Sequence, residues 1–181
     1  MRVFLAIEFT EEIKEYLYKT QQVIVKDSAS GNLTGKENFH LTLRFIGEIK
    51  DNELSKLKEA VDNIYFSQKE FKIYFNKIGQ FPRGKKRIIW IGLRPNHLLD
   101  LLHSKLESEL EKQGYSREDR KFVPHITLGR EVVLEKEFEE IQKKIIIENM
   151  EMNVDKISIM ESKRINGKLA YIPIYVKKLN Y

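Results

Sequence analysis

The chain repeats one pattern of strands and helices at an interval of 85 residues. Residues 2–9 (RVFLAIEF) and 87–94 (RIIWIGLR) are both rich in β-forming side chains, and so are residues 71–78 (FKIYFNKI) and 156–163 (KISIMESK). Each half reads strand, helix, strand, helix, strand, and each final strand leads into another through a basic connection that contains glycine. We therefore predict a single domain, residues 1–181, made of two pseudo-equivalent lobes.

The middle strand of each half carries the same tetrad, His-x-Thr-x. The tetrads are HLTL at residues 40–43 and HITL at residues 125–128, again 85 residues apart. Alternation along a strand places His40 beside Thr42, and His125 beside Thr127, on one face of each strand. Two such pairs that face each other across a groove would surround a small anion, such as a phosphate, with two proton-transfer groups and two hydroxyl donors.

These residue types also have an ordinary structural interpretation. A histidine in a strand is more often a hydrogen-bonded structural residue than a catalyst, and threonine is common in strands because its β-branched side chain packs well there. The repetition of the tetrad favours the functional interpretation. A metal site built from His40 and His125 is a third interpretation, which we disfavour because no carboxylate or thiolate ligands stand at useful spacing.

Composition limits the class of protein. The 181 residues are 41% hydrophobic, which is enough for one sizeable core. The chain has no cysteine, so disulfides and thiolate chemistry are excluded. The net charge of +5 favours an anionic partner only modestly. The apolar start of the chain is interrupted by Glu8, so we expect neither a signal peptide nor a membrane span, and we expect a cytoplasmic protein.

Capping residues and apolar stripes predict four helices. They are expected to begin after Thr10, at a cap formed by Asp51, after Pro95-Asn96, and near Leu134. Their apolar residues recur at spacings of three and four and mark the faces that enter the core. Polar or glycine-containing loops are expected at residues 27–38, 80–86 and 112–121.

The chain resembles the 2H phosphoesterases, and within them the RNA 2′,3′-cyclic phosphodiesterases of the LigT or ThpR group, also called RNA 2′-5′ ligases. The resemblance rests on the two tetrads with their flanks (HLTLRF and HITLGR), the opening RVFLAIEF, the segment FPRGKKRIIWIGL and the closing LAYIPIYVKKL. It implies an α+β fold in which two antiparallel sheets line a central groove, with helices on the outside. It also implies chemistry without a metal or other cofactor.

The resemblance implies roles for the tetrads. Opening a 2′,3′-cyclic phosphate with water needs a base for the water and an acid for the departing ribose oxygen. Following the family, His40 is the proton donor and His125 the proton acceptor, and the product is a 2′-phosphomonoester. Thr42 and Thr127 donate to the phosphoryl oxygens. The residues alone leave the two histidines interchangeable, because the repeat makes their surroundings similar.

Two arginines are candidate phosphate ligands. The family has an arginine at the place of Arg130, but strict alternation points Arg130 away from His125, so either the strand kinks at Gly129 or Arg130 serves elsewhere. Strict alternation places Arg44 on the same face of the strand as His40, where it could bind the phosphate. The alternative interpretation is that Arg44 is a solvated cation at the end of the strand.

Further substrate contacts are expected from basic turns and aromatic side chains. Arg83 and Lys85, in the turn RGKKR, and the Lys163-Arg164 turn stand at equivalent places in the two halves and could hold RNA phosphates, although charged turns are usually only solvated. Phe45 is a candidate for stacking on a base, as are Phe81 and Tyr171, whereas aromatic residues in strands are more often core. Trp90 is expected in the core, and His97 and His103 are given no role.

Three interpretations of the function stay open from the sequence. The first is an RNA 2′,3′-cyclic phosphodiesterase that acts on RNA ends, tRNA fragments among them, as a monomer, and that also runs as a 2′-5′ ligase. The second keeps the chemistry but takes a small cyclic nucleotide. The third is a non-catalytic RNA-binding module, for which two intact tetrads are an unnecessary feature. We favour the first.

Overall fold

The structure is a computed structural model, and it describes residues 1–147 and 150–179. The elements in chain order are β1 (Arg2–Glu8), α1 (Glu11–Val25), β2 (Ser28–Leu33), the 3₁₀ helix η1 (Lys36–Asn38), β3 (His40–Glu48), α2 (Asp51–Asp62), β4 (Phe71–Arg83), β5 (Lys86–Leu93), α3 (His97–Lys112), β6 (His125–Leu134), α4 (Phe138–Lys144), β7 (Glu151–Val154), β8 (Lys156–Ile165) and β9 (Lys168–Lys178).

The strands form two antiparallel sheets, and each sheet contains one tetrad. The four-stranded sheet has the order β3-β1-β8-β9 and carries His40 on β3, and the five-stranded sheet has the order β2-β6-β5-β4-β7 and carries His125 on β6. The repeat is visible in this order, since β3-β1-β8 of one sheet corresponds to β6-β5-β4 of the other. The expected α+β fold with two antiparallel sheets is confirmed.

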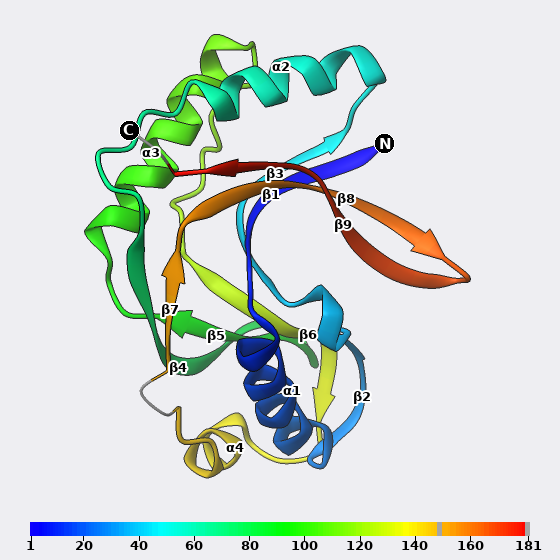
Figure 1. The fold of residues 1–181 in the computed structure, drawn as a ribbon. Helices are drawn as coiled ribbons and strands as arrows, with labels where there is room; N and C mark the ends of the chain where they lie inside the picture. Colours follow the sequence, from blue (N-terminus) through cyan, green and yellow to red (C-terminus); the bar gives the residue numbers. More distant parts are fainter. Residues whose placement is uncertain (148–149, 180–181) are drawn as a thin grey trace.

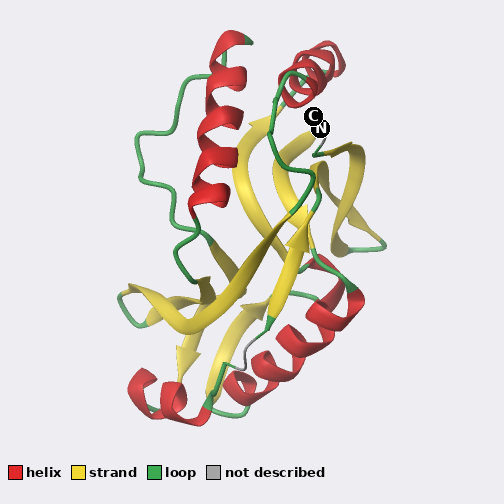
Figure 2. Cartoon of the chain, turned by 60° about the vertical axis from the view of Figure 1, so that its left-hand side comes forward, coloured by secondary structure: helices red, strands yellow, loops and turns green. Residues whose placement is uncertain are grey.

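The two sheets exchange parts of the chain. β8 and β9 come from the end of the sequence and complete the sheet that begins with β1 and β3, while β2 and β7 add to the sheet built on β4, β5 and β6. Helices α2 and α3 pack together over the four-stranded sheet, and α1 packs with α4 against the other (Figure 1). Figure 2 shows the helices on the outside of the strands. Neither half of the sequence therefore builds a complete lobe by itself.

The predicted helices form, with two differences at their ends. Thr10 caps α1 by accepting from Ile13 N, and Asn96 caps α3 by accepting from Leu99 N at 3.0 Å. Asp51 was expected as a cap but is the first residue of α2, and the N-cap is Lys50, whose N–H donates to the Glu53 carboxylate. Leu134 was expected at the start of a helix but closes β6, and the helix begins at Phe138.

Two of the expected loops contain strand. Residues 27–38 include β2, which has the sequence SASGNL and pairs with β6 at the edge of the five-stranded sheet. Most of β2 is exposed, so it lacks the apolar alternation by which a strand is recognised in a sequence. Residues 80–86 are mostly strand as well, because β4 and β5 leave only Gly84 and Lys85 as the turn, and Gly84 has a φ of +62°. Residues 113–124 are without helix or strand, apart from turns, close to the expected loop.

Strand β1 is covered on both faces. Val3, Leu5 and Ile7 enter the main core beneath the helices, whereas Phe4 and Ala6 join Met160 in a smaller apolar cluster on the opposite face. This smaller cluster lies beneath the first tetrad, because Phe4 packs against the His40 ring at 4.8 Å between ring centroids. The apolar run VFLAI thus supports both the core and the groove.

Candidate active site

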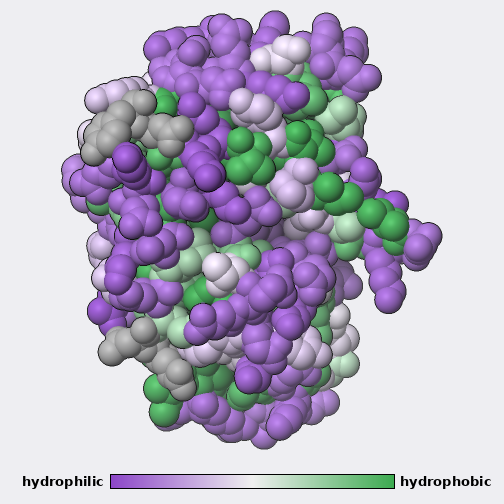
Figure 3. All heavy atoms as spheres, in the orientation of Figure 1, coloured by the Kyte–Doolittle hydropathy of each residue, from purple (hydrophilic) through white to green (hydrophobic). Residues whose placement is uncertain are grey.

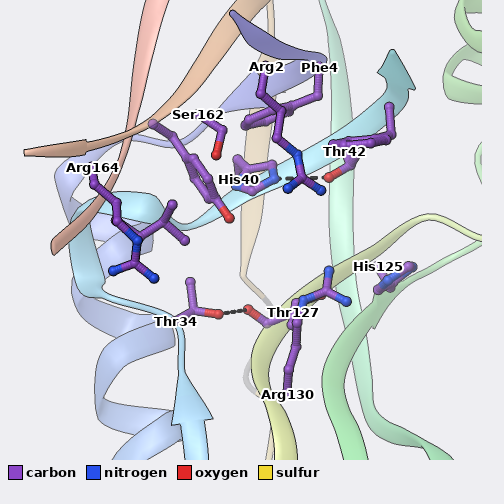
Figure 4. Close-up of a pocket in the computed structure, with 13 residues that line it drawn as sticks. Arg2, Phe4, Thr34, His40, Thr42, His125, Thr127, Arg130, Ser162 and Arg164 are labelled. Carbon is purple, nitrogen blue, oxygen red and sulfur yellow. Dashed lines mark hydrogen bonds between the residues drawn. The ribbon is translucent and has the colours of Figure 1, made fainter. Parts of the chain in front are cut away.

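Both tetrads open onto one cavity between the two sheets. The cavity has a volume of about 630 Å³. It is lined by Arg2, Phe4, Thr34, His40, Thr42, Phe45, His125, Thr127, Arg130, Ser162, Arg164, Leu169 and Tyr171. Figure 4 shows His40 and Thr42 on the upper side of this space, with Thr127, Arg130 and His125 across from them. The structure therefore brings all four tetrad side chains to a single site, as the repeat predicts.

A β-bulge after the second tetrad turns Arg130 into the cavity. Trp90 of β5 pairs with Thr127, but the next residue, Ile89, pairs with Gly129, so β6 contains one extra residue at this point. The extra residue shifts the alternation, and Arg130 lines the same cavity as His125. A side chain at Gly129 would lie 2.9 Å from Val132, which explains the glycine. Of the two alternatives left by the sequence, the kink at Gly129 is confirmed.

The first tetrad is followed by a corresponding bulge. Ala6 of β1 pairs with Thr42 while Leu5 pairs with Arg44, so β3 also contains an extra residue. As a result Phe45 lines the cavity and Arg44 does not. The expectation that Arg44 shares the face of His40 is wrong, because it assumed strict alternation. Phe45 and Arg130 occupy equivalent places in the repeat.

Each catalytic candidate is oriented by a backbone carbonyl. His40 Nδ1 lies 2.7 Å from the carbonyl oxygen of Asn38, and His125 Nδ1 lies 2.7 Å from that of Val123. A carbonyl oxygen can only accept, so each Nδ1 carries a hydrogen and donates it. Proton exchange is left to Nε2 of both rings, and His40 Nε2 is 2.9 Å from Thr42 Oγ1.

The surroundings lower the pKa of both imidazoles. Burial is the largest cause for His40 and for His125, and the positive charge of Arg130 acts in the same direction on both. The hydrogen bond to the backbone carbonyl opposes the shift in each ring. An anion bound in the cavity would favour the protonated rings. Because the two pKa values move in the same direction, their shifts do not tell the acid from the base.

Aromatic side chains hold each ring from the side. Tyr171 meets His40 edge-on at 5.1 Å between ring centroids and also contacts Phe4, at 5.0 Å, while Phe81 meets His125 edge-on at 5.4 Å. Trp90 lies 6.1 Å from His125. The expectation that Trp90 lies in the core is wrong, since it is only partly buried and covers Gly79. Its cross-strand pairing with Thr127 places it on the tetrad face of the sheet.

The cavity contains two further cations, of which the sequence singled out Arg164, in the Lys163-Arg164 turn, but not Arg2. Arg2 lines it and lies over the Phe45 ring at 5.0 Å, and Arg164 lines its other side (Figure 4). Thr34 and Ser162 also line it, and Thr34 Oγ1 donates to the Thr127 carbonyl at 2.8 Å. Arg2 stands at the very start of an apolar strand, and Thr34 lies in an expected loop, so no local pattern marked them.

The other basic residues lie outside the cavity. Arg83 and Lys85 are exposed at the β4–β5 turn, and neither lines the cavity. Lys163 pairs with Glu161 on its own strand. Figure 3 shows the β8–β9 hairpin projecting from the body of the protein with apolar side chains along it, and Ile165 and Leu169 are both exposed there. The expected phosphate contacts from Arg83 and Lys85 therefore require RNA that extends beyond the cavity.

Two further observations concern alternative classes. Within residues 1–147 and 150–179, no group of three or more histidine, aspartate or glutamate side chains is placed to hold a metal ion. No helix in the part of the chain that the structure describes is long and apolar enough to span a membrane.

Two facing sheets, each with one His-x-Thr pair on a common cavity, are the arrangement of a 2H phosphoesterase. The sequence model of the LigT-like phosphoesterases matches this chain twice, over residues 7–90 and 91–171, in agreement with the internal repeat. The chain belongs to the LigT-like phosphoesterase family.

Named relatives are found in bacteria and archaea. The RNA 2′,3′-cyclic phosphodiesterase of Thermotoga maritima is 31% identical over 163 residues, which cover 90% of this chain and 87% of that protein. The RNA 2′,3′-cyclic phosphodiesterase of Methanocaldococcus jannaschii is 38% identical over 131 residues, covering 72% of this chain and 71% of the relative. The crystal structure of Escherichia coli LigT complexed with 3′-AMP superposes with a TM-score of 0.81 at 26% identity, over 99% of this chain and 98% of LigT.

Proposed function

We propose that this protein hydrolyses the 2′,3′-cyclic phosphate at RNA ends to a 2′-phosphomonoester by acid–base catalysis without a metal. The observation that carries the proposal is the pair of histidines on separate sheets, each with Nδ1 committed to a backbone carbonyl and both lining one cavity with Arg130. This arrangement leaves two equivalent proton-transfer atoms, Nε2 of each ring, for opposite ends of one displacement at phosphorus. The relatives named as RNA 2′,3′-cyclic phosphodiesterases support it.

The reaction balances with the groups at hand. Neutral His125 removes a proton from water, the water oxygen bonds to phosphorus, and the bond from phosphorus to the ribose 3′ oxygen breaks. Protonated His40 gives its Nε2 proton to that oxygen, so the product carries its phosphate on the 2′ oxygen. A 5′-hydroxyl in place of water gives a 2′-5′ phosphodiester by the same proton transfers. After each turnover the two rings regain their starting protonation by exchange with solvent.

The remaining groups balance the charge on the phosphoryl oxygens. Thr42 accepts from Nε2 of protonated His40, so its own hydroxyl hydrogen is free to point to a phosphoryl oxygen. Thr127 lines the same cavity, where its hydroxyl donates to a second phosphoryl oxygen. Arg130 supplies a fixed positive charge that stabilises the developing charge at phosphorus.

One assay tests the proposal. An RNA that ends in a 2′,3′-cyclic phosphate is incubated with the protein in a metal-free buffer, and the product is identified by phosphorus NMR. A 2′-phosphomonoester is expected. A 3′-phosphomonoester, or no turnover, contradicts the proposal.

The roles of the two histidines have a test of their own. A cyclic substrate with sulfur at the bridging 3′ position has a leaving group that needs little protonation. We expect this substrate to restore turnover to His40→Ala and not to His125→Ala, because only the acid becomes dispensable. Rescue of His125→Ala instead would exchange the two roles.

A second candidate substrate class is a small cyclic nucleotide. The cavity volume of about 630 Å³ lies within the range of ordinary small-molecule pockets, which favours this alternative. Rates on a cyclic mononucleotide and on a cyclic-ended oligonucleotide distinguish the two classes. A non-catalytic RNA-binding role is the outcome if neither is hydrolysed. The tRNA-fragment substrate, the monomeric state and the cytoplasmic location stay predictions.

A further inference from the structure

Arg44 of β3 forms a buried ion pair with Glu107 of α3. Its Nη1 lies 3.0 Å and 3.3 Å from the two carboxylate oxygens, and the side chains are only 10% and 8% exposed. Its Nη2 donates to the carbonyl oxygen of Ser116 at 2.5 Å. The Nε of Arg44 is buried and finds no hydrogen-bond partner among the residues that the structure describes.

Both members of this pair hold the segment 113–124, which joins α3 to β6. Arg44 binds the carbonyl of Ser116, and Glu107 accepts from the backbone N–H of Glu118 at 3.4 Å. Further along the segment, Phe122 stacks on His103 of α3 at 3.9 Å between ring centroids, with the rings nearly parallel. The segment lies outside the strands and runs beside α3 (Figures 1 and 2), so these side chains supply much of its anchoring.

The anchored segment leads directly to the second tetrad. Val123 is its last residue but one, and the carbonyl of Val123 accepts from His125 Nδ1 at 2.7 Å. At the other end of the network, Arg44 stands two residues after Thr42 on β3. A continuous set of contacts therefore connects the strand of the first tetrad to the backbone group that orients the histidine of the second.

The energetics of the pair favour a geometric role over a stabilising one. Burying two charges costs most of what their attraction returns, and apolar side chains of similar volume are often as stable or more so. The unpaired Nε of Arg44 adds a further cost. What an ion pair provides that an apolar pair does not is a fixed direction, because the planar guanidinium binds the carboxylate and the Ser116 carbonyl at once.

We propose that Arg44 and Glu107 are positioning residues, which hold segment 113–124 so that the Val123 carbonyl orients His125 toward His40. The proposal rests on the proposed function, in which His125 Nε2 must meet the attacking water. Neither residue lines the cavity. They act through the segment that carries the acceptor for His125 Nδ1.

The main test replaces the ion pair by an apolar pair of similar length, Arg44→Met with Glu107→Met. We expect the melting temperature to stay at or above that of the wild type, and kcat to fall by about 10- to 100-fold, the scale for a catalytic group displaced by an ångström or less. KM should change little, because the cavity residues are untouched. Ring nitrogen shifts of His125, measured by NMR at pH 8, should change from one tautomer to a mixture, while those of His40 stay as in the wild type.

Two further variants keep the test decisive. Glu107→Gln preserves the shape of the side chain and one oxygen acceptor, and it replaces the double variant if the double variant does not fold. We expect a smaller loss of kcat from Glu107→Gln, with the His125 shifts changing in the same direction. Asp27→Asn is the matched control, because it removes the ion pairs of Asp27 with Lys136 and Lys144 at the far end of β6. It should lower the melting temperature and leave kcat as it is.

The outcomes separate this proposal from the proposed function. Wild-type kcat and unchanged His125 shifts in any folded variant without the ion pair overturn the positioning role. If the wild-type protein does not open a cyclic phosphate at all, the proposed function fails, while the His125 shifts still decide whether the pair orients this ring.

Discussion

Asn38 holds His40 with its backbone and the β9 edge with its side chain. Its carbonyl oxygen accepts from His40 Nδ1 at 2.7 Å, its Nδ2 donates to the Leu169 carbonyl at 2.9 Å, and its Oδ1 accepts from Tyr171 N at 3.1 Å. One residue therefore connects the tautomer of the first histidine to the hairpin whose Leu169 and Tyr171 line the cavity.

Asn38→Ala should lower kcat by roughly 10-fold, because the carbonyl that orients His40 loses its anchor on β9. The expected change is larger in kcat than in KM. The measurement is steady-state hydrolysis of a cyclic-ended oligonucleotide. Asn153→Ala is the matched control, because Asn153 lies on β7 and its amide donates to the exposed Glu70, away from the cavity residues. Equal rates for the two variants would contradict the role of Asn38.

His40→Ala and His125→Ala should each reduce turnover by roughly two to four orders of magnitude, the usual range for a positioned acid or base. RNA binding should stay nearly intact, since the guanidinium groups of the cavity remain. The double variant should be little worse than either single variant because the two rings act as a unit. Single-turnover rates and direct binding measure both quantities. A near-wild-type rate in either single variant would rule out the paired-histidine mechanism.

The pH dependence of kcat/KM should be bell-shaped with its maximum below pH 6.5. The reaction needs one ring protonated and one neutral, a state that is most populated between the two pKa values. Both pKa values are lowered from 6.5, mainly by burial, so the free enzyme loses its acid as the pH rises toward neutrality. The profile of kcat should lie at higher pH, since the bound anion favours protonated rings. A kcat/KM that still rises at pH 8 would contradict the lowered pKa values of the two histidines.

Activity should be complete in the presence of EDTA, because both proton transfers and the charge on the phosphoryl oxygens are served by side chains of the cavity. The rate is measured before and after prolonged chelation. A loss that zinc or manganese restores would assign the protein to metal-dependent phosphoesterases instead.

Neutralising Lys163 and Arg164 together should weaken the binding of a cyclic-ended oligonucleotide more than that of a cyclic mononucleotide. The slope of affinity against salt should fall by about one for each phosphate group that the variant no longer binds. Arg164 lines the cavity, whereas Arg83 and Lys85 do not, so the double variant Arg83→Gln with Lys85→Gln is the comparison. If this second variant binds the oligonucleotide more weakly but the mononucleotide as before, RNA runs past the β4–β5 turn. Equal weakening on both substrates would assign these residues to the fold or the cavity floor.

The sequence by itself determined the features that depend on local pattern. The 85-residue repeat predicted two related lobes rich in strand, the apolar stripes with Thr10 and Asn96 predicted the helices, and the repeated tetrad singled out His40 and His125, which the structure places on one cavity. These succeed because side-chain alternation, helix periodicity and capping involve only residues close in the chain.

Tertiary structure alone decided which neighbours of the tetrads reach the cavity. A β-bulge arises from pairing with another strand, so the sequence of β3 does not reveal that Phe45 faces the cavity while Arg44 points away from it, toward Glu107 of α3. For the same reason the sequence of β6 does not reveal that Arg130 faces the cavity. The polar edge strand β2 forms through hydrogen bonds to β6, which leave no apolar pattern in its own residues. Arg2 enters the cavity because β1 is paired on both sides, with β3 and with β8, which are far away in the chain.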